Sequence, residues 1–293
     1  MIELEEGVAL ATLTTIGTGG PARWFARPRT IGELEELLQW ASSARVAVEA
    51  IGLGSNVLAA DEGVEALVLR LAGDLATVQI EGDILVAGGG ATNALCLHRA
   101  RDAGLGGFEF AAAIPGTAGG GVRMNAGAYG RDWRAVLIDA VVVGPDGTST
   151  LTVDELELSY RHSRLAPGEI VARARFRLSR RSPETIKADM AELLARRKAT
   201  QPTTKRTFGS VFKNPGEGPG AGSLIEQCGL KGFRIGGAVI SDRHANFIEN
   251  AGGALSRDAL ALMAAARGRV WEQFGVALEH EVRFLGRLEL PPL

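Results

Sequence analysis

The sequence IPGTAGGGVRMNAGAYG occupies residues 114–130, and two shorter segments, GTGGPA at 17–22 and GLGSN at 52–56, are also rich in glycine. Glycine lets a backbone approach a phosphate group closely, and consecutive N–H groups can form a concave anion site without any lysine. Each segment taken alone is more often a tight turn. Three such segments in one chain favour backbone-mediated binding of a diphosphate.

Other phosphate-binding folds are disfavoured. The chain contains no G-x-G-x-x-G in a strand-turn-helix setting and no G-x-x-x-x-G-K-[ST], so neither a dinucleotide-binding Rossmann fold nor a P-loop is predicted. The net charge of −2 over 293 residues argues against nucleic-acid or anionic-membrane partners. The arginine stripe at 173, 175 and 177 is interpreted as a solvated strand face.

Location and metal binding are also constrained by the sequence. The acidic N-terminus lacks the pattern of a signal peptide, and no apolar run reaches the roughly 18 residues of a membrane span. Cys96 and Cys228 lie far apart in the sequence and form no metal-ligand spacing. We therefore expect a cytoplasmic protein with no membrane association and no structural metal.

Hydrophobic patterning predicts an α+β protein. Thr30 can cap a helix over 31–44, and residues 170–178 alternate between apolar residues and arginines as a half-exposed strand does. A helix start at Ser182-Pro183 places a domain boundary near residue 180. A smaller α/β domain follows, and its closing strand at 277–286 is expected to return to the domain interface.

Six segments carry a more specific resemblance. Between about residue 17 and residue 286 the chain resembles the UDP-N-acetylenolpyruvoylglucosamine reductases (UDP-N-acetylmuramate dehydrogenases), and its compact length resembles their shorter type II branch. The matching runs, in order, are GLGSN, IPGTAGGGVRMNAGAYG, SYRHS, GSVFKNP, AGSLIEQCGLKGFRIGGAVISDRHANFIEN and FGVALEHEVRFLG.

The resemblance implies a fold and a cofactor. The expected fold is an FAD-binding domain of the vanillyl-alcohol-oxidase (PCMH) type, with subdomains at about 1–72 and 73–180, and a substrate-binding domain at 181–293. Non-covalent FAD would be the cofactor. Where the family commonly has alanine, this chain has Gly121, and the smaller residue should still permit the approach to the cofactor. The residues expected at the FAD diphosphate are Gly52, Gly54, Ser55 and Asn56 from one subdomain and Gly116, Thr117, Gly119 and Gly120 from the other.

The resemblance also implies a reaction, in which NADPH reduces the flavin and the flavin then reduces an enolpyruvyl ether. Ser210 would donate the proton, Arg161 would pair with the substrate carboxylate or the developing enolate, and Glu281 would anchor the arginine or assist protonation. Without the resemblance, the three would be interpreted as a turn serine, an exposed arginine and a solvated strand end.

The expected substrate is UDP-N-acetylglucosamine enolpyruvate. Its binding is assigned to the segment 230–250 more firmly than to single residues. The individual candidates are Tyr160, Lys213, Asn214, Lys231 and Arg234. Two other functions stay open at this point: an oxidase with the same FAD fold, and a non-catalytic sugar-nucleotide-binding protein. The sequence does not reveal the oligomeric state.

Overall fold

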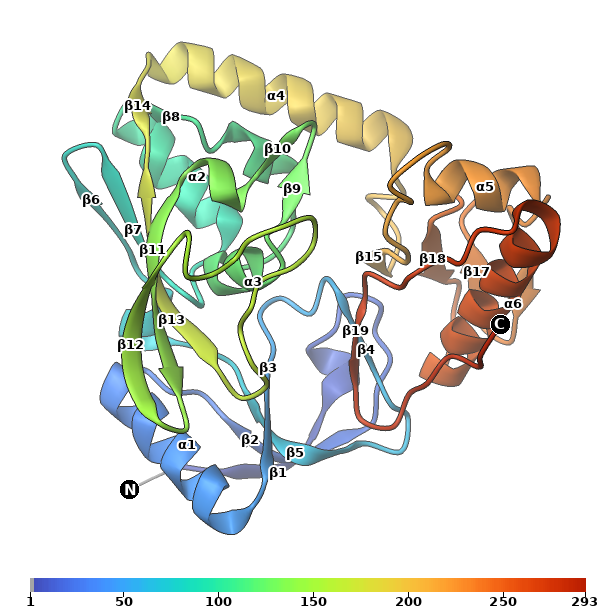
Figure 1. Cartoon of the computed structure of the whole chain (residues 1–293), viewed down its shortest axis with the longest axis horizontal. Helices are drawn as coiled ribbons and strands as arrows, with labels where there is room; N and C mark the ends of the chain where they lie inside the picture. Colours follow the sequence, from blue (N-terminus) through green and yellow to red (C-terminus); the bar gives the residue numbers. More distant parts are fainter. Residues whose placement is uncertain (1–2) are drawn as a thin grey trace. The chain divides into compact units, whose positions relative to one another are not determined.

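The computed structural model describes residues 3–293, which form two compact units (Figure 1). The first unit contains Trp24–Leu53 and Ala66–Arg197, together with residues 3–5. The second contains Glu6–Arg23, Gly54–Glu65 and Lys198–Leu293. The chain therefore crosses between the units several times, and the boundary passes through the GLGSN segment.

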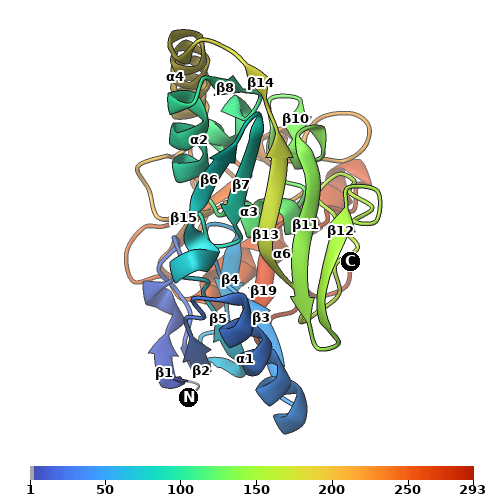
Figure 2. The same ribbon diagram turned by 90° about the vertical axis from the view of Figure 1, so that its left-hand side faces the viewer.

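A five-stranded sheet is the centre of the first unit (Figure 2). All neighbouring strands in it are antiparallel. The strand order is β12 (Gly147–Thr152), β11 (Leu137–Gly144), β13 (Ile170–Arg177), β7 (Ile84–Gly88) and β6 (Val78–Glu81). The predicted alternation is confirmed in β13, where the arginines at 173, 175 and 177 are exposed and Phe176 is buried.

Helices α2 (Asn93–Asp102) and α3 (Ala118–Arg123) pack against this sheet around a core that includes Phe108, Trp133 and Phe176. The two helices follow glycine-rich turns and begin with a threonine cap. The Thr92 side chain accepts from the N–H of Leu95, and the Thr117 side chain accepts from that of Gly120. Both caps satisfy N–H groups that a helix start leaves without a partner.

The predicted helix at 31–44 is confirmed as α1 (Ile31–Ala44), with the Thr30 hydroxyl accepting from the N–H of Glu33. Its buried leucines pack with β3 (Ala47–Ala50) and β5 (Val64–Leu69), which pair in parallel. With β1 (Glu5–Ala9) and β2 (Pro21–Ala26) these strands form a sheet in the order β1, β2, β5, β3.

The region around residue 180 lies inside the first compact unit. Strand β14 (Ser179–Arg180) pairs with β8 (Leu105–Gly106), and the helix predicted to start at Ser182-Pro183 is observed as α4 (Pro183–Thr200). The change of unit falls between Arg197 and Lys198, near the end of that helix.

The second unit contains a four-stranded antiparallel sheet with the order β15 (Thr207–Ser210), β18 (Phe247–Asn250), β17 (Ala238–Ile240) and β16 (Arg234–Ile235). Helix α6 (Ser256–Phe274) packs against β16 and β17, and α5 (Ala221–Gln227) packs against α6. Phe208, Phe212, Ile248 and Met263 belong to the core between these elements.

Polar contacts tie the early segments of the chain into the second unit. The Asp61 carboxylate accepts from the N–H groups of Ser256 (2.8 Å) and Arg257 (2.9 Å), so it caps α6 from outside the helix. The buried hydroxyls of Ser256 and Thr18 hydrogen-bond at 2.7 Å. These contacts explain why residues 6–23 and 54–65 group with the C-terminal part.

The closing strand is shorter than predicted. Strand β19 covers only Arg283–Leu285 and pairs in parallel with β4 (Val57–Ala59). The residues before it hydrogen-bond to a different segment, because the N–H of Glu281 donates to the carbonyl of Val211 (2.8 Å). The polypeptide thus changes its pairing partner within 277–286, which interrupts the regular strand.

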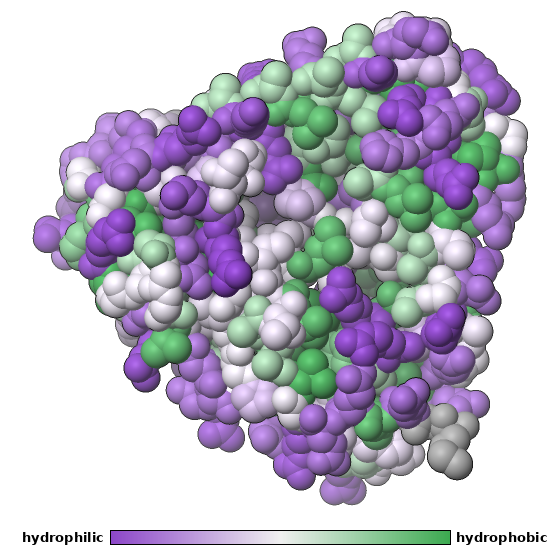
Figure 3. All heavy atoms as spheres, turned by 180° about the vertical axis from the view of Figure 1, so that it is seen from behind, coloured by the Kyte–Doolittle hydropathy of each residue, from purple (hydrophilic) through white to green (hydrophobic). Residues whose placement is uncertain are grey.

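The face shown in Figure 3 is a mixture of hydrophilic, intermediate and hydrophobic residues. Within residues 3–293, no helix has both the length and the apolar character that crossing a bilayer requires.

Candidate active site

In the first unit, Gly52 lies against Thr117. A Cβ built on Gly52 would stand 2.7 Å from the Thr117 hydroxyl oxygen, closer than real Cβ atoms approach. Thr117 in turn caps α3, where its hydroxyl accepts from the N–H of Gly120 at 3.4 Å. The structure therefore brings together the two segments that the sequence assigned to different subdomains, and only glycine fits at position 52.

Part of the α3 start already has backbone partners. The N–H of Ala118 donates to the carbonyl of Ala91, and that of Gly119 donates to the carbonyl of Gly89, both at 2.9 Å. A Cβ on Gly119 would stand 2.9 Å from the same Gly89 oxygen. Gly119 therefore permits close packing of α3 on the sheet, and its direct contact with a diphosphate stays a prediction.

The outer side of this turn has few side chains, and flavin binding there stays a prediction. Gly116 has φ +156°, in the region that favours glycine, and Gly120 is exposed. Among the described residues outside its own helix, a Cβ on Gly120 would meet nothing nearer than the Thr117 hydroxyl at 3.5 Å. A surface with so few side chains allows a cofactor to lie directly against the backbone.

Arg161 is placed beside the glycine-rich segment by a tight turn. Ser159 and His162 exchange backbone hydrogen bonds of 3.2 and 3.1 Å, and Arg161 between them has φ +56°. Its Nη2 donates to the carbonyl of Gly127 at 2.9 Å, and its Cζ lies 4.9 Å from the ring centre of Tyr160. The guanidinium is thus oriented from two directions, while Tyr160 is half exposed.

Asn125 is a residue that the sequence analysis did not select. It is 1% exposed, and its Nδ2 donates to the carbonyl of Ser159 (2.9 Å) while its Oδ1 accepts from the N–H of Arg134 (3.0 Å). Asn125 therefore holds the turn that carries Arg161 against the 114–130 segment. Its position inside the glycine-rich segment 114–130 was the one feature of the sequence that pointed to a role for Asn125.

Ser210 ends β15 in the second unit. Its register partner is Phe247, and the ladder between β15 and β18 is irregular just before it, where Gly209 has φ +82°. A Cβ on Gly209 would stand 3.1 Å from the carbonyl oxygen of Ser55. The GLGSN segment and the GSVFKNP segment are thus neighbours in this unit.

Glu281 and Asn56 meet through backbone groups. The Asn56 side-chain amide donates to the carbonyl of Glu281 at 3.2 Å, and the carbonyl of Asn56 accepts from the N–H of Arg283 at 3.0 Å. Because the N–H of Glu281 also bonds to Val211, the peptide at Glu281 connects the Ser210 region to Asn56. Contact between Asn56 and a diphosphate stays a prediction.

Lys213 and Asn214 have protein partners. Lys213 Nζ lies 3.2 Å from a carboxylate oxygen of Glu279, and Asn214 Oδ1 accepts from the N–H of Ala221 at 3.0 Å, at the start of α5. Binding a substrate through these side chains would require them to share or exchange these contacts.

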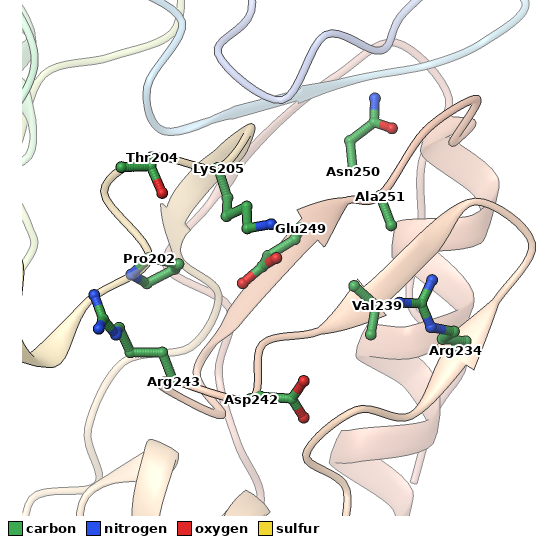
Figure 4. A pocket seen from close by; sticks show the side chains of 10 residues that line it. All are labelled: Pro202, Thr204, Lys205, Arg234, Val239, Asp242, Arg243, Glu249, Asn250 and Ala251. Carbon is green, nitrogen blue, oxygen red and sulfur yellow. The ribbon is translucent and has the colours of Figure 1, made fainter.

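Lys231 and Arg234 have different surroundings. Lys231 pairs with Glu226 at 2.6 Å, beside His244, whose pKa is lowered by burial and by the lysine charge. Arg234 lines a pocket of about 550 Å³ that Lys231 does not line (Figure 4). Three basic and two acidic side chains line it, namely Lys205, Arg234, Arg243, Asp242 and Glu249.

A cationic cluster in the first unit was missed. The Tyr129 hydroxyl is buried and has no hydrogen-bond partner within residues 3–293, and the Cζ of Arg196 lies 4.7 Å from the ring centre of Tyr129. Burial lowers the pKa of the neighbouring Arg197 guanidinium. Tyr129 stands in the 114–130 segment and is one of two tyrosines, so composition offered a weak signal.

The predicted site residues are therefore divided between the units. The first unit contains Gly52, Gly116, Thr117, Gly119, Gly120, Tyr160 and Arg161. The second contains Gly54, Ser55, Asn56, Ser210, Lys213, Asn214, Lys231, Arg234 and Glu281. The joint action of Arg161 with Ser210 and Glu281 stays a prediction.

Two family profiles match the chain. Residues 22–152 match the family profile described as "FAD binding domain", and residues 201–285 match that of the "UDP-N-acetylenolpyruvoylglucosamine reductase, C-terminal domain". The reductase of that name from Novosphingobium aromaticivorans is 43% identical over 287 residues, covering 97% of this chain and 96% of that protein. The chain belongs to the UDP-N-acetylenolpyruvoylglucosamine reductase family.

Further relatives support the same family. The reductase from Anaeromyxobacter dehalogenans strain 2CP-C is 45% identical over 283 residues, covering 97% of this chain and 85% of that protein. The crystal structure of the Thermus caldophilus reductase has a TM-score of 0.85 at 38% identity and covers 97% of this chain and all of that one. The predicted fold class is confirmed, and the chain is an FAD-dependent oxidoreductase of peptidoglycan precursor synthesis.

Proposed function

We propose that this protein reduces UDP-N-acetylglucosamine enolpyruvate to UDP-N-acetylmuramate, with NADPH as the reductant. The observation that carries the proposal is the reductase family match over 97% of the chain, including the segments that contain Ser210 and Glu281. When bound, FAD supplies the hydride chemistry. The candidates to hold it are Gly116, Thr117 and Gly120 in the first unit, with Ser55 and Asn56 in the second.

Arg161 binds the carboxylate of the enolpyruvyl group in this proposal. A guanidinium keeps its charge at any physiological pH and matches the two oxygens of a carboxylate. The bond to Gly127 and the Tyr160 ring orient it before the substrate arrives. As negative charge develops on the enolate, the attraction to Arg161 increases, which stabilises the transition state.

Ser210 donates the proton to the carbon adjacent to the one that receives hydride. A serine hydroxyl is a weak acid, so it needs stabilisation of its alkoxide-like state by nearby charge or hydrogen bonds. Glu281 is placed within the same hydrogen-bonded segment, since its N–H bonds to the residue after Ser210. We assign it the role of supporting protonation.

The uridine diphosphate requires further cations and donors. In the second unit the candidates are Lys213, Asn214, Lys231 and Arg234. In the first unit the Tyr129 hydroxyl and Arg197 add a donor and a charge in a partly buried place. A diphosphate contact there would satisfy the buried hydroxyl, which otherwise has a desolvation cost.

The test separates the two half-reactions. The flavin-loaded protein is reduced with NADPH in the absence of oxygen, mixed with the enolpyruvyl substrate and followed by visible flavin absorbance. We expect rapid return of the oxidised spectrum. In Ser210→Ala, reduction by NADPH should be unchanged, while reoxidation should slow by about two to four orders of magnitude. A wild-type flavin that stays reduced until air enters would instead indicate an oxidase.

The preference for NADPH is tested in the same experiment with NADH as the alternative reductant.

The cytoplasmic location predicted from the sequence stays a prediction. Both cysteines are free thiols, which is the state that a reducing compartment maintains.

A further inference from the structure

The side chain of Asn246, the residue just before β18, forms two hydrogen bonds with the backbone near Ser210. Its side chain is buried, with 4% of the residue exposed. Oδ1 accepts from the N–H of Phe212 at 2.9 Å, and Nδ2 donates to the carbonyl of Phe212 at 2.8 Å. One side-chain amide therefore satisfies both backbone groups of a residue that lies two positions after Ser210.

The neighbouring backbone groups are also fixed. The N–H of Val211 donates to the carbonyl of Asn246 at 2.9 Å, and the carbonyl of Val211 accepts from the N–H of Glu281 at 2.8 Å. The N–H of Lys213 donates to the carbonyl of Glu279 at 2.9 Å. The three residues after Ser210 are thus held by Asn246 and by the 279–281 segment.

The local strand geometry explains why an amide side chain is needed there. The pairing of β15 with β18 ends at Ser210 and Phe247, after an irregularity at Gly209. Phe212 is 1% exposed, so its N–H and carbonyl would be buried without partners if Asn246 were absent. The backbone of Asn246 is also held in place, because its backbone N–H donates to Nδ1 of His244 at 3.2 Å.

We propose that Asn246 is a positioning residue for the protonation step. Its amide fixes the backbone that carries Ser210 relative to the backbone of Glu281, and so directs the Ser210 hydroxyl. This inference rests on the role of Ser210 in the proposed function. A displacement of about 1 Å in a reacting group can reduce a rate about 100-fold, so a clamp two residues away has a measurable effect.

Two variants test this role in the flavin-loaded protein. Asn246→Ala removes both side-chain bonds, and Asn246→Asp keeps the acceptor for the N–H of Phe212 but places a second acceptor against its carbonyl. We expect reoxidation by the enolpyruvyl substrate to slow by about 10- to 100-fold in both. Reduction by NADPH should stay within about twofold of wild type, and the solvent deuterium isotope effect on reoxidation should increase.

Ser256→Ala is the matched control. It removes another buried hydrogen bond of the same unit, that between the Ser256 and Thr18 hydroxyls, and should lower stability without changing either half-reaction. The decisive measurement is the double variant. If Asn246 acts through Ser210, then Asn246→Ala should change the residual rate of Ser210→Ala by less than about twofold.

Three outcomes would overturn the inference: wild-type reoxidation in both Asn246 variants, an equal loss in both half-reactions, or an undiminished effect of Asn246→Ala when Ser210 is already alanine. Failure of the proposed function looks different. In that case the reduced wild-type protein itself is not reoxidised by the enolpyruvyl substrate.

Discussion

The indole of Trp133 lies directly over Gly121. A Cβ built on Gly121 would stand 2.3 Å from Cε2 of the indole, and Trp133 is fully buried. An alanine at position 121 would therefore clash with the indole. The absence of a side chain at Gly121 serves the packing of the core beneath α3, which is a different reason from access to the cofactor.

Gly121→Ala should consequently lower the free energy of unfolding by about 1–3 kcal/mol, the usual cost of overpacking a core. Replacing the indole by a smaller side chain in Gly121→Ala/Trp133→Leu should cost less than the sum of the two single changes. Urea denaturation followed by circular dichroism measures both. Additive losses would mean that the two residues are not in steric conflict.

Gly120→Ala, one position earlier in the same helix, should behave in the opposite way. Outside the helix's own backbone, the nearest atom that a Cβ there would meet in residues 3–293 is the Thr117 hydroxyl oxygen at 3.5 Å, so the fold should retain its stability or gain slightly. If FAD lies against this backbone, the dissociation constant for FAD should rise. Flavin fluorescence titration of the apoprotein checks this, and unchanged FAD affinity would remove Gly120 from the cofactor site.

Arg161→Lys tests the guanidinium at constant charge. An ammonium cannot make the planar two-oxygen contact, so the second-order rate of reoxidation by substrate should fall by about 10- to 100-fold, equivalent to a charged hydrogen bond. Arg164→Lys is the control from the same loop, since Arg164 is exposed and its guanidinium Nε donates to the carbonyl of Glu155 at 2.6 Å. Equal rates in the two variants would argue against carboxylate binding by Arg161.

His244 should make stability depend on pH. Burial, and secondly the charge of Lys231, lower its pKa in the folded protein. The unfolded chain binds the proton more readily, so the free energy of unfolding should fall as the pH drops below about 6.5, the ordinary histidine pKa. His244→Asn should reduce this slope in denaturation curves collected between neutral and mildly acidic pH. An unchanged slope would assign the acid sensitivity to other groups.

The two cysteines should differ in reactivity. Burial raises the pKa of the Cys96 thiol to about 12, so very little thiolate exists near pH 8. Cys228 is partly exposed, and its pKa is also raised by burial. A colorimetric thiol reagent should label Cys228 slowly in the native protein and label both after denaturation. Rapid labelling in Cys228→Ser would show that the α2 region opens.

Local features were predictable because their causes lie within a few residues. The Thr30 cap, the alternation of arginines in β13 and the helix start at Ser182-Pro183 depend on side chains close in sequence, and the structure confirms them. The glycine-rich segments could also be recognised from the sequence. The sequence did not separate Gly119, which permits close packing of α3 on the sheet, from Gly120, which is a candidate for backbone contact with the cofactor.

The sequence by itself determined the family, the fold class and the segments from which the site is built. Only the tertiary structure decided which residues hold those segments. Asn246 and Asn125 each bond to the backbone of a residue 34 positions away in the sequence, and Asp61 caps a helix that starts 195 residues later. In each of these contacts a side chain bonds to main-chain N–H or carbonyl groups. Almost every residue carries such groups, so the residue type of the partner does not show in the sequence that it is the partner.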